Sequence, residues 1–126
     1  MLSIVASQCS VEENEDCLLS AYGNLVDSDY VAISLSKKVS DQDRELGVDG
    51  LHVEVNDQSR SCYNGVQRIE LIGCDRMILH LSDVGQRELE ISQIRVKAMC
   101  ENTSPFDLVQ RMAIIALVEF EVKSHD

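Results

Sequence analysis

Apolar and polar residues alternate along most of the chain, and this period of two residues is typical of strands that bury one face. The clearest example is 51–55, where Leu51, Val53 and Val55 alternate with polar neighbours. Gly, Asn, Asp and Ser residues, which favour turns, separate the alternating segments. The pattern predicts seven short strands, at 4–11, 17–22, 30–35, 51–55, 66–72, 76–81 and 91–98.

One segment near the C-terminus follows a helical pattern instead. Ser104 is followed by Pro105, which is typical of a helix start because the hydroxyl caps free backbone N–H groups and proline suits the first helical position. The run 112–118 is apolar on all sides, which predicts a well-buried helix. The β-branched residues of 117–122 leave a strand open as an alternative there.

Two polar segments interrupt the predicted strands. Residues 40–50 are rich in turn formers and predict a loop with one helical turn at most. Residues 56–64 predict the connection of a β-hairpin, because Asn64 and Gly65 form a strong turn dipeptide. Further along, Ser82 is a suitable cap for a short helix.

Together these elements predict an α+β fold, in which a C-terminal helix packs on a mainly antiparallel β-sheet of about seven short strands. With 126 residues and no internal repeat, residues 1–126 are expected to form a single domain.

The chain is strongly acidic, with 22 Asp and Glu residues against 11 Lys and Arg residues and a net charge of −11. Phosphate backbones repel such a surface, so binding to nucleic acid is not expected. The same charge attracts a basic partner, although it also has the simpler role of keeping the protein soluble.

The cysteine pattern and the N-terminus bear on the cellular compartment. Five cysteines occur without CxxC spacing, which predicts free thiols in a reducing environment rather than a zinc site or a disulfide framework. The N-terminal apolar run is too short for a signal peptide, and no stretch is long enough to span a membrane. We therefore expect a soluble, cytoplasmic protein.

The acidic loop is the first candidate for chemistry. It contains four carboxylates within nine residues but lacks the EF-hand series of ligands, so a solvated loop is favoured over a metal site and a partner-binding surface is the remaining alternative. These four residues are Asp41, Asp43, Glu45 and Asp49.

Catalytic patterns are absent from the sequence. His52, His80 and His125 lack HExxH or HxH spacing, and no nucleophile elbow or glycine-rich phosphate loop is present. We therefore expect no enzymatic activity, no metal and no cofactor.

The segment 56–64 has two interpretations. Its Asn, Asp and Ser side chains bond to their own backbone and favour a self-contained turn, in which Arg60 pairs with Asp57 or with the acidic loop. Alternatively it is a recognition loop displayed on a rigid sheet.

The central stretch also resembles a known family. The matching order is an acidic loop with Asp43, Gly47 and Asp49, a strand with Glu54, the triplet 57–59, then Tyr63-x-Gly65-Val66 and x-x-Ile69-x-Leu71. This order resembles the immunity protein 10 family of bacterial polymorphic toxin systems, and the looser frame of strands and terminal helix fits the whole chain. The chain departs from the family pattern at Asn64, where a second glycine is expected, and at Gly50, which suggests a bulge.

The resemblance implies a small, cytoplasmic, non-catalytic protein that binds and neutralises a cognate toxin. An acidic inhibitor would gain association rate with a basic toxin. We expect the contact residues in the 41–50 and 56–64 segments, where Tyr and Arg are types enriched at binding hot spots. The candidates are Asp43, Glu45, Asp49, Asp57, Gln58, Arg60 and Tyr63.

Two other function classes stay open. A structural domain without a toxin partner could form a homodimer through exposed strand edges. A small ligand-binding protein would need a closed apolar pocket that converges on His52 or His80.

Overall fold

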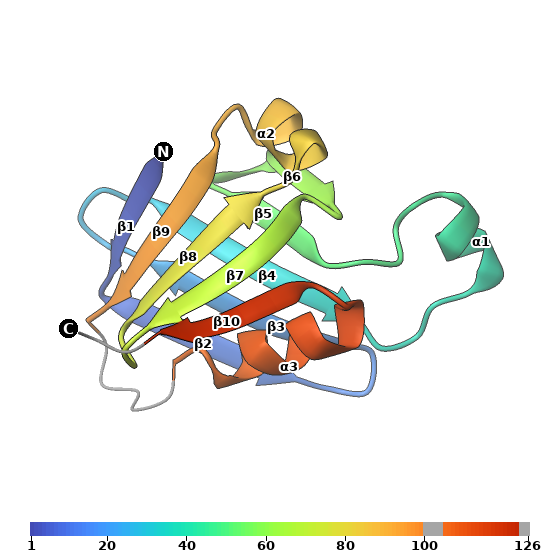
Figure 1. Ribbon diagram of the computed structural model, residues 1–126, viewed down its shortest axis with the longest axis horizontal. Helices are drawn as coiled ribbons and strands as arrows, with labels where there is room; N and C mark the ends of the chain where they lie inside the picture. Colours follow the sequence, from blue (N-terminus) through green and yellow to red (C-terminus); the bar gives the residue numbers. More distant parts are fainter. Residues whose placement is uncertain (100–104, 124–126) are drawn as a thin grey trace.

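A computed structural model shows two five-stranded β-sheets packed face to face, with three helices at their margins (Figure 1). The structure describes residues 1–99 and 105–123. Sheet A contains, in spatial order, β1 (Leu2–Ala6), β9 (Gln93–Ala98), β8 (Arg76–Leu81), β7 (Val66–Ile72) and β10 (Glu119–Lys123). Sheet B contains β2 (Gln8–Glu13), β3 (Cys17–Gly23), β4 (Tyr30–Ser36), β5 (His52–Val55) and β6 (Asp57–Tyr63). The helices are α1 (Asp41–Glu45), α2 (Asp83–Leu89) and α3 (Asp107–Ala116).

The two sheets differ in topology. Sheet B is a meander in which each strand pairs antiparallel with the next along the chain. Sheet A has an antiparallel centre, β7–β8–β9, and a parallel strand at each edge, because β1 pairs with β9 and β10 pairs with β7. The predicted α+β class is confirmed.

The hydrophobic core lies between the sheets and follows the alternation seen in the sequence. In β8, for example, Met77, Leu79 and Leu81 are buried while the residues between them are half-buried on the outer face. One inward polar group is Tyr22, whose hydroxyl donates a 2.6 Å hydrogen bond to the carbonyl oxygen of Pro105. The Tyr22 ring also packs against Phe106, with ring centroids 5.2 Å apart. These contacts join the start of α3 to the middle of sheet B.

The predicted strands are confirmed in place, but the structure has three more. The segment 4–11 is two strands, since the chain passes from sheet A to sheet B at Ser7. The segment 56–64 is not a connection: Asn56, with φ 62°, forms the turn, and β6 follows as an edge strand. The strand alternative for 117–122 is confirmed by β10.

One predicted helix start and one predicted helical turn are confirmed. Ser82 caps α2 as predicted, with its Oγ accepting from the N–H of Gly85 at 3.2 Å. A single helical turn, α1, occurs in the acidic loop. For α3 the expected start is wrong, because Phe106 is the N-cap and Pro105 precedes it; Ser104 lies outside the described residues.

The expected burial of α3 is wrong for one side of the helix. Leu108, Val109 and Met112 are buried against the sheets, whereas Ile114 is 65% exposed and Ile115 is 60% exposed.

The cysteines also differ from expectation in part. Cys9 is disulfide-bonded, so the prediction of free thiols is wrong for this residue. Cys17, Cys62 and Cys74 are free, and Cys74 is exposed. Cys62 is half-buried beside α2, and burial raises the pKa of its thiol. No helix of the described chain combines the length and the apolar character that a membrane span requires.

Candidate protein-binding face

The acidic loop folds into an arm that projects from the end of the two sheets, between β4 and β5 (Figure 1). A capping box holds its single helical turn, since Ser40 Oγ accepts from the Asp43 N–H at 3.1 Å and the Asp43 carboxylate accepts from the Ser40 N–H at 3.0 Å. Asp41 and Arg44 form an exposed ion pair at 2.9 Å. No residue of α1 is buried, so local hydrogen bonds rather than core packing define the arm.

A groove of about 480 Å³ lies between this arm and the C-terminal end of α3. The floor is apolar and comes from the ends of β3 and β4, while the rim carries charge from the arm and from the β4 end. Its lining residues are Leu18, Leu35, Ser36, Lys37, Val39, Arg44, Asp49, Ile115 and Ala116. The groove therefore combines apolar contact area with charged groups of both signs.

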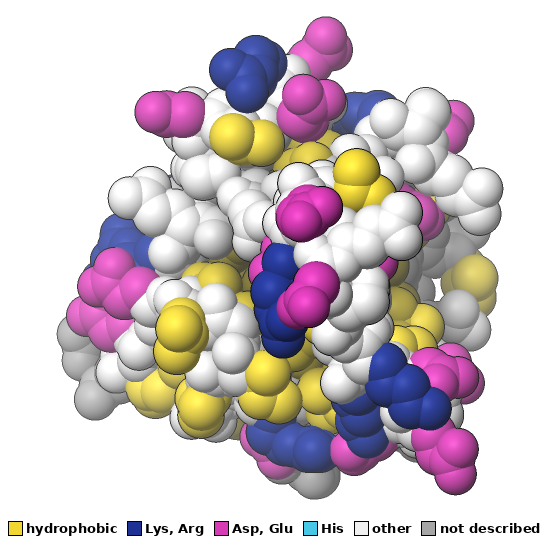
Figure 2. Space-filling view, turned by 90° about the vertical axis from the view of Figure 1, so that its right-hand side faces the viewer, with side chains coloured by type: hydrophobic (Ala, Val, Ile, Leu, Met, Phe, Trp, Pro, Cys, Tyr) yellow, Lys and Arg dark blue, Asp and Glu magenta, His cyan; other side chains and the backbone are white. Residues whose placement is uncertain are grey.

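Large apolar side chains are exposed beside the groove. Ile114 and Ile115 project from α3, Leu117 directly after it is 91% exposed, and Leu46 on the arm is 67% exposed. Figure 2 looks onto this end of the molecule and shows hydrophobic side chains in its lower half, beside acidic and basic ones. A grouped apolar surface with a polar rim is typical of a protein-binding site.

Leu117 is also held in an unusual backbone conformation. Its φ is 58°, in the left-handed region, and its N–H donates to the carbonyl of Ala113 as the C-cap of α3. Glycine is the common residue at such a position, because a bulky side chain raises the energy of the left-handed conformation. Because the Leu117 side chain is exposed, its packing contributes little to offset this conformational energy, which indicates a role other than stabilising the fold.

A three-residue ion cluster fixes α3 against sheet B next to the groove. Arg111 donates from both terminal nitrogens to the Glu13 carboxylate, at 2.9 and 3.0 Å, and Lys37 Nζ lies 2.9 Å from Glu13 Oε2. The hydrogen bonds from Arg111, followed by those from Lys37, lower the pKa of Glu13 from 4.5 to about 2. The Glu13 carboxylate thus joins the end of β2 to the end of β4 and to α3.

The three predicted residues of the arm occupy different environments. Asp43 is engaged in the capping box, Glu45 is exposed, and Asp49 is half-buried in the groove lining. Only Asp49 among the seven predicted residues lines the groove.

The four predicted residues of β6 lie on an edge strand. Asp57 accepts from the N–H of Ser59 at 2.9 Å, which lowers the pKa of its carboxyl. Arg60 donates to the carbonyl oxygen of Leu89 at 2.8 Å and so binds the end of α2. Gln58 is exposed, and Tyr63, also exposed, packs on the ring of His52 at 4.6 Å.

The sequence interpretation missed the apolar half of this face. Leu46, Ile114, Ile115 and Leu117 were not among the candidates. The apolar run 112–118 was the only signal for the last three, and Leu46 had none. That run is apolar on every side of the helix, whereas a helix that buries one face requires apolar residues on that face only.

Metal-binding groups do not converge in the described part of the chain. Within residues 1–99 and 105–123, no three His, Cys, Asp or Glu side chains lie together as metal ligands. His52 and His80 are half-buried on separate sheets, and burial lowers the pKa of His52.

Exposed apolar side chains beside a groove on a two-sheet scaffold are typical of a domain that binds another protein. The chain belongs to the immunity protein 10 family, which matches residues 5–103. No curated protein and no solved structure matches the chain. The family match ends before α3 begins at Asp107, so the groove joins a shared segment, the arm, to a segment outside the match.

Proposed function

We propose that this protein is a non-catalytic, cytoplasmic immunity protein of a bacterial polymorphic toxin system, which binds a cognate toxin and neutralises it. Membership of the immunity protein 10 family supports the general role. Stoichiometric inhibition needs a stable scaffold and a complementary surface, and it requires no catalytic group.

We further propose that the toxin binds at the groove between α1 and α3. The observation that carries this assignment is the exposure of Ile114, Ile115 and Leu117 beside a groove that combines apolar and charged lining residues. A few well-packed, desolvated residues near the centre of an interface supply most of its binding energy, and burial of exposed apolar side chains contributes to association.

The net charge of −11 favours a basic toxin, because long-range attraction raises the association rate. Glu45 and Asp49 lie on the arm and are the acidic contacts we propose. Gln58 and Tyr63 on β6 are exposed and stay in the proposal as peripheral contacts. Asp43, Asp57 and Arg60 would contribute indirectly, since their hydrogen bonds hold the local backbone.

The test uses the product of the adjacent toxin gene, inactivated by mutation of its own active site, and isothermal titration calorimetry. We expect Ile115→Arg with Leu117→Arg to weaken binding at least tenfold, which corresponds to about 1.4 kcal/mol. Val84→Arg on α2 is the control, because Val84 is an exposed apolar residue away from the groove.

Co-expression with the active toxin supplies the second readout. The wild-type protein and Val84→Arg should restore growth, and the groove variant should not. Unchanged binding by a folded groove variant would reject this face, whereas no binding by the wild-type protein would reject the toxin-neutralising function itself.

A further inference from the structure

Three basic side chains meet on the outer face of sheet A, at the end where β8 begins and β9 ends. Arg76 on β8 lies directly opposite Lys97 on β9, and Arg95, two residues before Lys97, lies opposite Ile78. Arg76, Arg95 and Lys97 are here called the basic patch. β1 and β9 lie at the opposite side of the molecule from the α1 arm (Figure 1).

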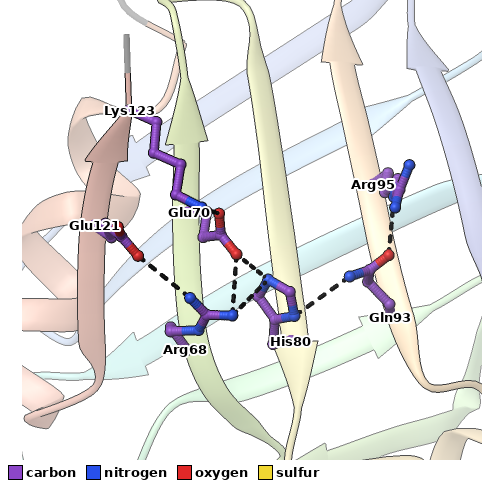
Figure 3. A network of polar contacts seen from close by, with 7 residues as sticks. All are labelled: Arg68, Glu70, His80, Gln93, Arg95, Glu121 and Lys123. Atoms are coloured by element: carbon purple, nitrogen blue, oxygen red, sulfur yellow. Dashed lines mark hydrogen bonds and ion pairs between the residues drawn. The ribbon is translucent and has the colours of Figure 1, made fainter.

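The basic patch has little internal neutralisation. The nearest carboxylate oxygen to Arg76 Nε belongs to Asp75 and is 4.0 Å away. Arg95 Nε donates to the amide oxygen of Gln93 at 2.8 Å (Figure 3), and Lys97 forms no ion pair with any described residue. Like charges directly opposite on paired strands destabilise a sheet, so an anion bound here would relieve that repulsion.

The neighbouring part of the same face is neutralised. Arg68 lies 3.1 Å from Glu70 Oε1 and 3.2 Å from Glu121 Oε2, and Lys123 lies 2.7 Å from Glu70 Oε2 (Figure 3). Among the described residues on this outer face of sheet A, Arg95 and Lys97 form no ion pair and Arg76 forms only a long one, although the whole chain carries a net charge of −11.

An apolar hollow of about 210 Å³ lies between these cations. Val5 on β1, which is 51% exposed, and the half-buried Ile72 and Ile78 contribute its apolar side chains. The hollow thus offers apolar contact and positive charge within one small area.

We propose that the basic patch binds an acidic segment of a partner protein, whose carboxylates pair with Arg76, Arg95 and Lys97 while an apolar side chain of the same segment contacts Val5 and Ile78. The hollow is smaller than the roughly 300–1,000 Å³ of typical small-molecule sites. Nucleic acid is disfavoured because aromatic stacking platforms do not line the hollow and the rest of the surface is acidic. A second copy is disfavoured because both chains carry −11.

The test uses a synthetic peptide of eight residues in which Glu and Leu alternate, added to the full-length ¹⁵N-labelled protein. We expect backbone resonances of β8 and β9 around Arg76, Ile78, Arg95 and Lys97 to shift on titration. The Arg95→Glu, Lys97→Glu variant should lose at least tenfold in affinity for the peptide. A peptide in which Gln replaces Glu should bind at least tenfold more weakly than the acidic one.

The matched control is Lys38→Glu with Arg87→Glu, which makes the same change in net charge at two exposed sites on other elements. This control should keep wild-type affinity, and both variants should stay folded, with backbone resonances unchanged away from the substituted positions. The proposal would be overturned by an equal loss of peptide affinity in the control, by equal binding of the Gln peptide, or by resonance shifts confined to other elements. Light scattering that shows a wild-type dimer abolished by Arg95→Glu, Lys97→Glu would overturn it in favour of a second copy. Because no toxin is used, the result is independent of the toxin-binding groove.

Discussion

The side chain of Lys123 reaches back across sheet A to Glu70, with its Nζ 2.7 Å from Glu70 Oε2. Glu70 is only 5% exposed although it lies on the outer face of β7, because Lys123, Arg68 and His80 cover its carboxylate (Figure 3). The hydrogen bond from Lys123 is the main cause of a lowered Glu70 pKa. One carboxylate thus holds the edge strand β10 to the centre of its sheet.

Replacing Glu70 is expected to loosen β10. Glu70→Gln leaves the two cationic side chains of Arg68 and Lys123, together with the His80 ring, around a neutral amide, so we expect the free energy of unfolding to fall by about 1–3 kcal/mol. Urea unfolding measures the loss, and hydrogen exchange at Glu119–Lys123 should rise locally. Glu121→Gln removes only an exposed pair with Arg68 and should cost less than about 1 kcal/mol. Equal effects of the two substitutions would contradict the central role of Glu70.

Acid should weaken the Glu13 cluster. The folded-state pKa of Glu13 is about 2, below the ordinary value of 4.5, so its ionised form contributes stability that is fully present above pH 4.5 and is lost as pH falls toward 2. We expect the difference in unfolding midpoint between the wild-type protein and Glu13→Gln to be constant above about pH 5 and to shrink below pH 4.5. A difference that grows on acidification would contradict this sign. Because the cluster is exposed, 1 M salt should reduce the difference.

The contact between α2 and the β6–β7 turn depends on two glycines. A Cβ atom on Gly85 would lie 2.1 Å from the carbonyl oxygen of Gly65, and this backbone atom cannot move independently of the turn. We expect Gly85→Ala to lower the free energy of unfolding by about 1–3 kcal/mol.

Gly50→Ala is the matched control for Gly85→Ala. The added Cβ would meet the side-chain oxygen of Asn64 at 1.8 Å, and a side-chain amide can rotate away. A cost below about 1 kcal/mol is therefore expected, and thermal unfolding compares the two. A larger cost at Gly50 than at Gly85 would show that the Asn64 side chain is as fixed as a backbone carbonyl.

Substitution of Leu117 should raise the stability of the fold and lower its affinity for the toxin. Leu117→Gly relieves the left-handed conformation and removes a side chain with almost no buried area, so we expect the free energy of unfolding to rise by about 1 kcal/mol. Toxin affinity should fall at the same time, if the groove is the interface. Glu90→Gly is the control, because Glu90 caps α2 with φ 60° and lies on a different element.

The control should gain similar stability with unchanged toxin affinity. Chemical denaturation and calorimetry on the same samples measure both quantities. A Leu117→Gly variant that is more stable and binds as tightly as the wild-type protein would remove Leu117 from the interface.

Alternation predicted the strands that bury one face, such as β4 and β8, since each inward side chain contributes to the core. It could not predict β6, because an edge strand such as Asp57–Tyr63 has few buried side chains and is defined by backbone pairing with β5. Nor could it predict the change of sheet at Ser7, because the alternation continues through 4–11 without a Gly or Pro residue.

Of the candidate site, only the charged residues of the arm were predictable from the sequence. The acids of the arm stand out in the sequence because no core explains them. Ile114 and Ile115 do not stand out, since an apolar residue in a helix is normally attributed to the core. Their exposure depends on the position of α3 at the margin of the sandwich, which the residues that bind Glu13 and Pro105 determine from distant parts of the chain.

The parallel edge strands of sheet A have a consequence for the order of events during synthesis. Leu2 pairs with Ile94, and β10 pairs with β7 across α2, β8, β9 and α3. The meander of sheet B can form while the chain is still emerging from the ribosome, whereas sheet A must wait for its later strands. The groove also needs α3, so a nascent chain could not bind through it until α3 has left the ribosome.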